Sequence, residues 1–418
     1  MLLFRVFSIP VRFFIALLIY FSWGPLAGGV VTAPVPEFSS PALIPYPSKV
    51  VRGAGEAGFR SVHVKVGSDV PGRDDLMKEI KDIFRTSGIQ GSLNSGGAAE
   101  GAMTWELFPD ARMKGEGYDL SVGLGKATVR AGSFGGFFNA LQTLRQLVFN
   151  REGEFAMPVV RISDKPAFVL RGIMLDVGRY YMSPALIKDV MRRLSRYKIN
   201  TLHLHLTDDP AWRLEVKKYP ALTDGAFHWK SRLPGRFYTQ AQLKDLTDYC
   251  ARLNIQVIPE IDMPGHSQPF ARAMKTGMQT EKGVSILKDV VDEAVSLFPG
   301  RFFHMGSDEA HISMKDFIPR MAEHIRGKGK EVVVWSPGGP HDKDSVLMCW
   351  GENEAGTRMD KNMKRIDSNG FYIDWADSQS GVYQVFFQQP CEVPQGDDKA
   401  LGAIMPVWCD GNLSSERR

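Results

Sequence analysis

The pattern of apolar and polar residues changes near residue 165 of the chain. Before that point, residues 62–66 and 120–122 alternate as half-buried strands do. Residues 136–147 place Phe137, Leu141 and other apolar side chains on one helical stripe. Residues 41–161 are therefore predicted to form a small α/β domain.

From Phe168 onward, short apolar runs alternate with amphipathic segments, which is typical of parallel βα units. Two of these segments begin with helix-start signals: Ser183 precedes Pro184, and Thr239 stands three residues before Gln242. The runs expected to be strands are residues 169–176, 201–206, 255–259, 302–305, 332–335, 346–350, 371–374 and 403–408.

Eight strands in roughly 240 residues match a (β/α)8 barrel. Residues 165–418 are therefore predicted to be a TIM barrel in an α/β fold, preceded by the small α/β domain. Helices are clear after the first four strands, and the later connections are short. The sequence continues for eight residues after Asp410, which leaves little room for a last barrel helix, so either another segment closes the barrel or the chain is truncated.

The first 30 residues have the layout of a secretory signal. Arg5 and Arg12 stand beside an almost uncharged run, residues 13–23, which small residues follow. The apolar part is shorter than the roughly 20 residues that a membrane-spanning helix needs. We expect a cleaved signal peptide, with an uncleaved anchor as the alternative. The mature protein is then exported (secreted, periplasmic or at the cell surface), and it meets a membrane only if the leader stays.

Charge and cysteine usage narrow the class of protein further. The net charge is +4, and loss of the two arginines in the leader makes it weaker still, so nucleic acid is not an expected partner. Four cysteines are far apart and form no CxxC pair. They indicate neither a zinc knuckle nor a disulfide framework, and buried free thiols are at least as well supported as a disulfide.

Polar or aromatic side chains follow nearly every predicted barrel strand. In a (β/α)8 barrel the catalytic groups lie at the C-terminal ends of the strands, so these side chains predict one shared site. They are Asp176 and Arg179, Asp208 and Asp209, Glu260, Asp262 and His266, Asp308 and Glu309, Trp335, Trp350, Tyr372 and Asp374, and Trp408 and Asp410.

Four of the segments that carry these residues resemble glycoside hydrolase family 20, the β-N-acetylhexosaminidases: residues 171–179, 203–209, 259–266 and 304–309. The helix that contains residues 141–146 is similar to part of that family's non-catalytic companion domain. The resemblance covers nearly the whole mature chain. It implies an exo-acting hydrolase that removes a terminal non-reducing β-linked N-acetylhexosamine, GlcNAc or GalNAc, from a glycan or oligosaccharide, with no cofactor and no metal.

The adjacent carboxylates of Asp308 and Glu309 are expected to have different roles in the reaction. The usual retaining arrangement needs two carboxylates about 5–5.5 Å apart across the scissile bond, whereas this family is among the substrate-assisted exceptions. The sugar's own acetamide oxygen attacks the anomeric carbon, which gives an oxazolinium-like intermediate. The resemblance implies that Glu309 is the general acid and base and that Asp308 orients the acetamide.

The resemblance also assigns residues that bind the sugar. Arg179 and Asp208 are expected to hold ring hydroxyls, and His266 with Asp208 to form a hydrogen-bonded relay to Glu309. The aromatic walls of the acetamide pocket and the contacts beyond them are expected from Trp335, Trp350, Trp408, Tyr372 and Asp374, where Tyr372 donates its hydroxyl to the acetamide oxygen.

Two positions depart from the family's pattern. Ser307 stands where the family usually has a second glycine, so the turn into Asp308 must accommodate a side chain. Asp410 stands where the family usually has glutamate and is shorter by one methylene. Recognition of a sugar hydroxyl by Asp410 is therefore expected to be altered.

Some residues are also compatible with two other classes of function. His203 and His205 face one way on their strand and, with Asp208, resemble part of a metal-dependent hydrolase site. Such a site also needs histidines where the chain has Trp335 and Trp350, so packing inside the barrel is the preferred interpretation of both histidines. A carbohydrate-binding protein that has lost turnover is the second alternative, and the intact acidic pair at 308 and 309 argues against it.

Overall fold

The computed structural model of the chain describes residues 42–94, 98–151, 153–351, 359–373, 385 and 387–410. These residues belong to one compact unit, Pro41–Arg418. The predicted leader and Asp374 lie outside the described residues. Among the helices that the structure describes, none combines the length and the apolar character that crossing a bilayer requires.

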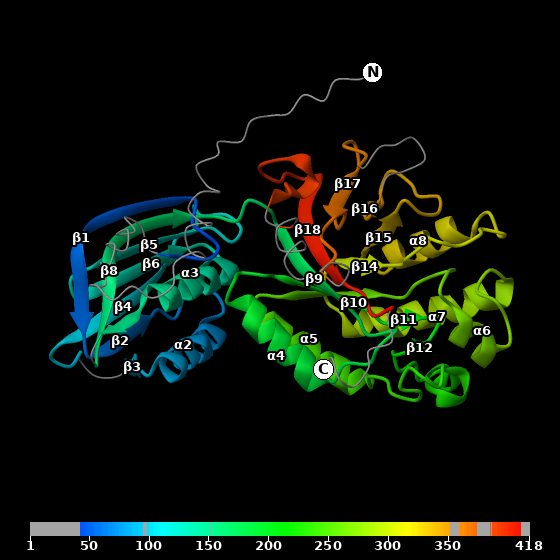
Figure 1. Cartoon of the computed structure of the whole chain (residues 1–418), viewed down its shortest axis with the longest axis horizontal. Coiled ribbons are helices and arrows are strands. Elements are labelled where there is room, and N and C mark those ends of the chain that lie inside the picture. The colour runs from blue at the N-terminus through cyan, green and yellow to red at the C-terminus, as the bar shows by residue number, and fades with distance from the viewer. Residues whose placement is uncertain are drawn as a thin grey trace, which may run out of the picture. The chain divides into compact units, whose positions relative to one another are not determined.

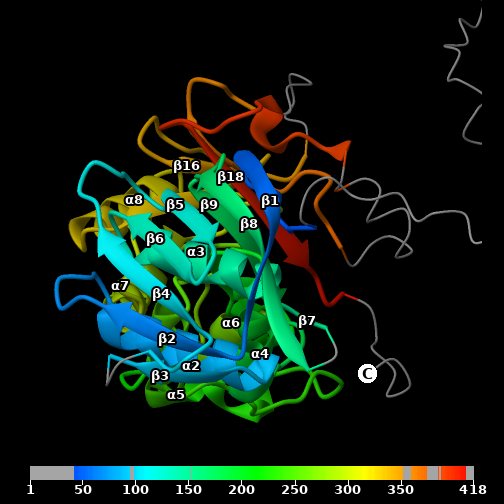
Figure 2. The same ribbon diagram turned by 90° about the vertical axis from the view of Figure 1, so that its left-hand side faces the viewer.

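A mixed sheet of eight strands forms the first part of the described chain, in the order β1-β8-β5-β6-β4-β2-β3 with β7 paired to β8. Figure 2 shows its strands side by side. Helix α3 buries the predicted stripe, including Phe137 and Leu141, against β5 and β6. The elements are β1 (Lys49–Phe59), β2 (Ser61–Val66), α2 (Arg73–Ser87), β3 (Gln90–Leu93), β4 (Ala102–Pro109), β5 (Tyr118–Gly123), β6 (Lys126–Ala131), α3 (Phe134–Leu147), β7 (Phe149–Arg151) and β8 (Glu154–Asp164).

Eight parallel strands then close a barrel in the order β10-β13-β14-β15-β16-β17-β18-β9 (Figure 1). This confirms the predicted fold class. The elements are β9 (Leu170–Asp176), α4 (Pro184–Ser195), β10 (Thr201–His205), β11 (Thr207–Asp208), β12 (Ala211–Trp212), η2 (Pro220–Thr223), η3 (Gly225–Phe227), α5 (Gln240–Arg252), β13 (Gln256–Glu260), α6 (Gln268–Met274), α7 (Glu281–Leu297), β14 (Phe302–His304), α8 (Phe317–Gly327), β15 (Glu331–Ser336), β16 (Val346–Cys349), β17 (Lys364–Asp367), η4 (Pro390–Glu392) and β18 (Ala400–Val407).

The two helix starts predicted from the sequence are confirmed. The hydroxyl of Ser183 accepts a hydrogen bond from the backbone N–H of Leu186, with Pro184 in the first turn of α4. At the start of α5, Thr239 and Gln242 form the full capping box. Each cap satisfies backbone N–H groups that have no partner inside the helix, so both helices begin where the sequence indicated.

The predicted seventh strand, residues 371–374, is wrong. The seventh strand is β17, Lys364–Asp367, which is largely polar and yet buried. Asp367 is satisfied there by the backbone N–H groups of Asn369 and Cys391. Backbone hydrogen bonds of this kind allow a polar side chain to be buried, so this strand can lack the apolar pattern of the other strands. Phe371 to Ile373 belong to the connection after the strand.

The barrel interior changes from apolar to polar along its strands. Leu170, Phe302 and Val346 belong to an apolar cluster that fills the interior. Toward the C-terminal strand ends, His205 and Glu260 are almost completely buried. Buried polar groups need hydrogen-bond partners, and the site described below supplies them. The four cysteines all lie among the described residues and are buried as thiols.

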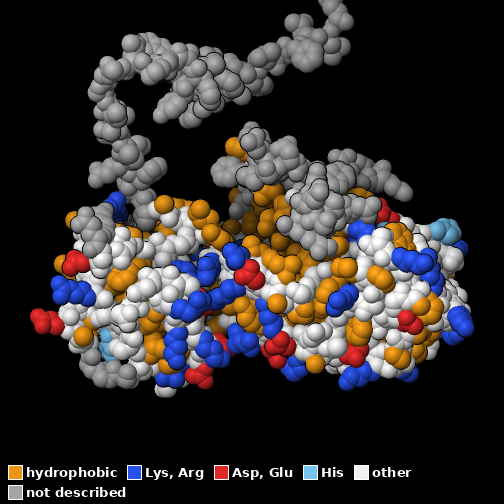
Figure 3. All heavy atoms as spheres, turned by 60° about the horizontal axis from the view of Figure 1, so that its bottom comes forward, with side chains coloured by type: hydrophobic (Ala, Val, Ile, Leu, Met, Phe, Trp, Pro, Cys, Tyr) orange, Lys and Arg blue, Asp and Glu red, His pale blue; other side chains and the backbone are white. Residues whose placement is uncertain are grey.

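Ion pairs join the sheet to the barrel within the compact unit. Lys198 Nζ lies 2.9 Å from Asp164 Oδ2, and Arg171 donates to Glu116 at 2.6 Å. On the face shown in Figure 3, Lys and Arg side chains gather near the middle with Asp and Glu side chains among them. This mixture is in keeping with the small net charge of the chain.

Candidate active site

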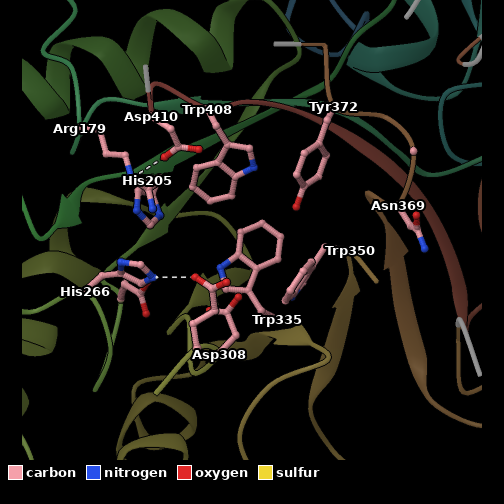
Figure 4. A pocket seen from close by; sticks show the side chains of 13 residues that line it. Arg179, His205, His266, Asp308, Trp335, Trp350, Asn369, Tyr372, Trp408 and Asp410 are labelled. Atoms are coloured by element: carbon pink, nitrogen blue, oxygen red, sulfur yellow. Dashed lines mark hydrogen bonds and ion pairs between the residues drawn. The ribbon is translucent and has the colours of Figure 1, made fainter. Parts of the chain in front are cut away.

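A cavity of about 480 Å³ opens at the C-terminal ends of the barrel strands. Figure 4 shows its side chains converging from several strands on one space. Asp208 lies directly behind the lining, in contact with Arg179, and Asp374 is outside the described residues. The lining consists of Arg179, His205, Asp262, His266, Asp308, Glu309, Trp335, Trp350, Asn369, Gly370, Tyr372, Trp408 and Asp410.

A tight turn after β14 aims the two adjacent carboxylates. Gly306, Ser307 and Glu309 have φ values of 67°, 83° and 49°. A Cβ on Gly306 would lie 1.8 Å from Asp262 Oδ1, so only glycine fits there. Ser307 occupies a left-handed backbone conformation that glycine adopts at less cost, and its buried hydroxyl has no hydrogen-bond partner among the described residues.

Asp308 and Glu309 meet different surroundings. Asp308 is half-buried, and burial together with the nearby charge of Glu260 raises its pKa to about 7. Glu309 keeps 59% of its side chain exposed, and its Oε2 lies 3.3 Å from His266 Nε2. One carboxylate therefore lines the enclosed part of the cavity and the other stands at its open side.

His266 lies between Asp208 and Glu309. Its Nδ1 is 3.4 Å from Asp208 Oδ1, while its Nε2 faces Glu309. The hydrogen bond with Asp208 raises the pKa of His266 to about 10. Burial opposes the charge on Asp208, but hydrogen bonds from His205 and His266 hold the pKa of Asp208 below its ordinary value. The structure thus brings together the three residues of the expected relay.

Arg179 is held by three carboxylates and one aromatic ring. Its guanidinium nitrogens lie 3.1 Å from Asp176, 3.0 Å from Asp208 and 3.0 Å from Asp410. The guanidinium carbon is 4.8 Å from the centre of the Trp408 ring. Although burial works against its charge, these carboxylates raise the pKa of Arg179 above its ordinary value, so a fixed cation forms one edge of the cavity.

Aromatic side chains form the rest of the wall. Trp335 is buried and donates its indole N–H to Glu260 Oε1 at 2.7 Å, and Trp350 donates to the carbonyl oxygen of Pro337 at 2.9 Å. The Trp408 ring centre lies 5.7 Å from that of Trp335 and 6.3 Å from that of Tyr372. Figure 4 shows the Tyr372 hydroxyl pointing in among these rings. The wall is apolar with one hydroxyl directed inward.

Some lining residues have no role predicted from the sequence. His205 is the last residue of β10, where the sequence favours packing, and Asp262 stands in the polar segment that follows β13. Asn369 and Gly370 follow the true seventh strand by two and three residues, so the misplaced strand concealed them. Burial, with the charges of Glu260 and Asp308, raises the pKa of Asp262 well above its ordinary value.

Three groups of described side chains bring atoms that could bind a metal within 4.8 Å of one another: His203, Glu260 and His304; His205, Glu260 and Asp262; and Asp208, Asp209 and His266. The rings of His203 and His304 stack 4.8 Å apart with an angle of 24° between their planes. Lone pairs of nearly parallel rings point side by side and do not converge on one ion. In the other two groups, His205 Nε2 and Asp208 Oδ2 lie 2.9 Å apart, so each of these atoms already has a polar partner.

Comparisons with known proteins agree with this architecture. Residues 40–165 match the model of glycosyl hydrolase family 20, domain 2, and residues 168–282 match that of the family 20 catalytic domain. A beta-hexosaminidase of Porphyromonas gingivalis is 30% identical in an alignment 382 residues long that covers 73% of this chain and 49% of that protein. One from Vibrio furnissii is 28% identical in an alignment 372 residues long that covers 70% of this chain and 61% of that protein. The chain thus spans about half to three-fifths of the length of these relatives.

Solved structures give the same result. A mutant Streptomyces plicatus beta-hexosaminidase in complex with its product GlcNAc matches with a TM-score of 0.75 and 26% identity, over 88% of this chain and 85% of that one. The beta-N-acetylhexosaminidase of Streptomyces coelicolor A3(2) matches with a TM-score of 0.76 and 25% identity, over 87% and 85%. With two family models in tandem and a closed barrel whose strand ends carry the motif residues, the chain belongs to glycosyl hydrolase family 20.

Proposed function

We propose that this protein hydrolyses the terminal, non-reducing β-linked N-acetylhexosamine of a glycan, with GlcNAc or GalNAc as the sugar released. The observation that carries the proposal is the placement of Asp308 and Glu309 on one turn, facing a single aromatic-walled cavity. Its volume of about 480 Å³ suits one sugar ring and the first atoms of a leaving group. The relatives named beta-hexosaminidase support the same activity.

The first step transfers a proton and closes a ring within the substrate. Glu309 gives its proton to the glycosidic oxygen as the bond from that oxygen to the anomeric carbon breaks. The carbonyl oxygen of the substrate's 2-acetamido group forms a bond to the same carbon from the opposite face, which gives an oxazolinium-like intermediate. Asp308 accepts a hydrogen bond from the acetamide N–H and balances the positive charge that develops there.

In the second step the proton moves in the opposite direction, toward Glu309. Glu309, now a carboxylate, takes a proton from water as that water attacks the anomeric carbon and the oxazolinium ring opens. Two displacements at one carbon return the original configuration, so the reaction is retaining. The 59% exposure of the Glu309 side chain leaves room for both the leaving group and the water.

The remaining predicted residues take part in binding. Arg179 and Asp410, paired at 3.0 Å, offer a donor and an acceptor to ring hydroxyls, and Asp208 holds Arg179 in place. Trp335, Trp350 and Trp408 pack around the acetamide and beneath the ring. Tyr372 donates its hydroxyl to the acetamide oxygen, which places that oxygen for attack. We assign Asp374, outside the described residues, to a sugar hydroxyl, as the family pattern implies.

Two measurements test the mechanism. A thiazoline analogue of the cyclised acetamide should inhibit far more tightly than the substrate binds, because it resembles the intermediate. NMR spectra recorded early in the reaction should show the β-anomer of the released sugar first. Absence of thiazoline inhibition would overturn substrate assistance, and initial release of the α-anomer would overturn retention.

Export of the protein is part of the proposal and rests on the sequence of residues 1–30 alone. Expression of the full chain in a secreting host, followed by N-terminal sequencing of the protein outside the cytoplasm, tests it. A new N-terminus near residue 30 in the exported fraction is the expected result. Full-length protein confined to the cytoplasm would contradict it.

A further inference from the structure

We propose that Glu260 and His205 are positioning residues that act on Glu309 through a buried chain of side chains, Glu260–His205–Asp208–His266–Glu309. The inference rests on the proposed function and extends it into the barrel interior. The sequence alone favours packing for His205 and places Glu260 in the strand-end cluster without a role. The structure places them at the inner end of the relay that reaches the general acid.

Each link of the chain is a close contact between side chains. His205 Nδ1 lies 2.6 Å from Glu260 Oε2, and His205 Nε2 lies 2.9 Å from Asp208 Oδ2. The other oxygen of Asp208 faces His266, whose Nε2 reaches Glu309. Glu260 is fully buried and His205 is 1% exposed, so water does not screen the first links.

The position of His205 between two carboxylates fixes its charge. A neutral imidazole has one N–H and one acceptor nitrogen, whereas an imidazolium donates from both. Both ring nitrogens of His205 face carboxylate oxygens, so the charged form satisfies both contacts. Burial opposes that charge, but Glu260 and Asp208 hold the pKa of His205 well above its ordinary value.

Other charged and aromatic groups lie close to His205, and some of them influence its charge. Asp176 on the neighbouring strand favours the charge on His205, and that charge contributes to the lowered pKa of the buried His203 on the same strand. His205 in turn lowers the pKa of Asp262, which burial raises strongly. The edge of His205 meets Trp408 with ring centres 5.1 Å apart. Among these groups in the described part of the chain, Glu260 and Asp208 are the two that contact its ring nitrogens.

A fixed cation at His205 limits the negative charge that Asp208 presents to His266. Asp208 shares its two oxygens among His205, His266 and Arg179. Without the charge on His205, the field at His266 and Glu309 becomes more negative, and His266 holds its proton to higher pH. Transfer of the proton from Glu309 to the leaving group then becomes less favourable, which slows hydrolysis of a substrate with a poor leaving group most.

Glu260 also acts on the other half of the site. Its Oε1 accepts the indole N–H of Trp335, and its charge contributes to the raised pKa of Asp308. Neutralising Glu260 therefore lowers the pKa of Asp308 and removes one of the charges that keep His205 protonated. The acid limb of the pH profile should then move to lower pH and the alkaline limb to higher pH. A residue that only packs the core would move neither limb.

The test is Glu260→Gln, which keeps the size of the side chain and an acceptor for Trp335. Aryl 2-acetamido-2-deoxy-β-glycosides with good and poor leaving groups are hydrolysed across pH by the wild type and the variant. We expect about a 10-fold loss of kcat/KM on the poor leaving group, a small loss on the good one, and a wider pH profile. His324→Gln is the control, because His324 Nε2 lies 2.7 Å from Asp292 Oδ1, away from this chain of contacts. It should change neither the rates on the two substrates nor the pH profile.

His205→Gln is the second variant, for use if Glu260→Gln does not fold. It retains a donor toward Asp208 without the charge, and the same selective loss on the poor leaving group is expected. Equal losses on both substrates with unmoved pH limbs, in whichever variant folds, would overturn the positioning role. Failure of the wild type to cleave either acetamido sugar would instead overturn the proposed function itself.

Discussion

Asp308 and Glu309 are adjacent in the chain, yet the carboxylate of Asp308 is half-buried near Glu260 whereas that of Glu309 stands exposed against His266. The turn at Gly306 and Ser307, with its positive φ values, produces this separation. A buried carboxylate suits charge stabilisation beside the acetamide, and an exposed one suits proton exchange with leaving group and water. The local backbone thus places two similar side chains in surroundings that suit different roles.

Substitution of Glu309 by glutamine should abolish most turnover while the protein folds normally. The amide keeps the size of the side chain but cannot give a proton, so the loss should reach about 100-fold or more on substrates with poor leaving groups. Steady-state kinetics with a thermal melt measure both effects. Glu323→Gln, on the exposed side of α8, is the control. Full activity of Glu309→Gln would remove Glu309 from its role.

Asp308→Asn should inactivate the enzyme and stabilise its fold at alkaline pH. Burial raises the pKa of Asp308 to about 7 from an ordinary 3.8, so the folded state binds more protons than the unfolded state between these values. The unfolding free energy of the wild type therefore falls as pH rises through this window. At pH 8 the variant should be more stable by on the order of 2 kcal/mol.

Urea denaturation at pH 8 and pH 4 measures that difference. Near pH 4 the carboxyl group is mostly protonated in the folded protein, so the advantage of Asp308→Asn should shrink toward zero. An advantage of the same size at both pH values would show that the substitution acts through packing rather than through charge.

Ser307→Gly should raise stability without a loss of activity. Serine at φ 83° costs about 1 kcal/mol or more relative to glycine in that conformation, and the substitution also removes a buried hydroxyl without a partner among the described residues. The greater freedom of glycine in the unfolded chain offsets part of the gain. We expect a rise in Tm of a few degrees, and a fall in Tm would show that the side chain of Ser307 is stabilising.

Asp410→Asn should raise KM more than it lowers kcat. The side chain is 63% exposed and pairs with Arg179 at 3.0 Å, so its contribution to folding is about 0–1 kcal/mol. A charged hydrogen bond to a sugar hydroxyl contributes about 1.5–3 kcal/mol, which corresponds to roughly a 10-fold or larger change in KM. Unchanged KM for Asp410→Asn would show that this residue does not contact the sugar.

The fold was largely predictable because its strands follow a simple rule. Parallel strands buried on both faces are short apolar runs, and the sequence shows such runs at β9, β10 and β13. The polar strand β17 breaks the rule, because backbone N–H groups satisfy Asp367 from outside the strand. Local pattern alone gives no sign of that compensation.

The site was predictable where residues stand at strand ends or match a family motif, as Arg179 and Trp408 do. The role of His205 was not, because its charge depends on Glu260, 55 positions away in the chain. A carboxylate on a neighbouring strand turns a packing residue into a fixed cation. The exposure of Glu309 likewise depends on the turn at Ser307 and was not evident from the residue types.

Acetamide dependence is the central claim, and hydrolysis of two matched aryl β-glycosides tests it most directly. One carries a 2-acetamido group and the other a 2-hydroxyl, with the same leaving group, and the enzyme is the purified protein without residues 1–30. Cleavage confined to the acetamido sugar is the predicted result. Equal cleavage of both would contradict substrate assistance, and binding of the free sugar without cleavage of either would contradict the enzymatic function.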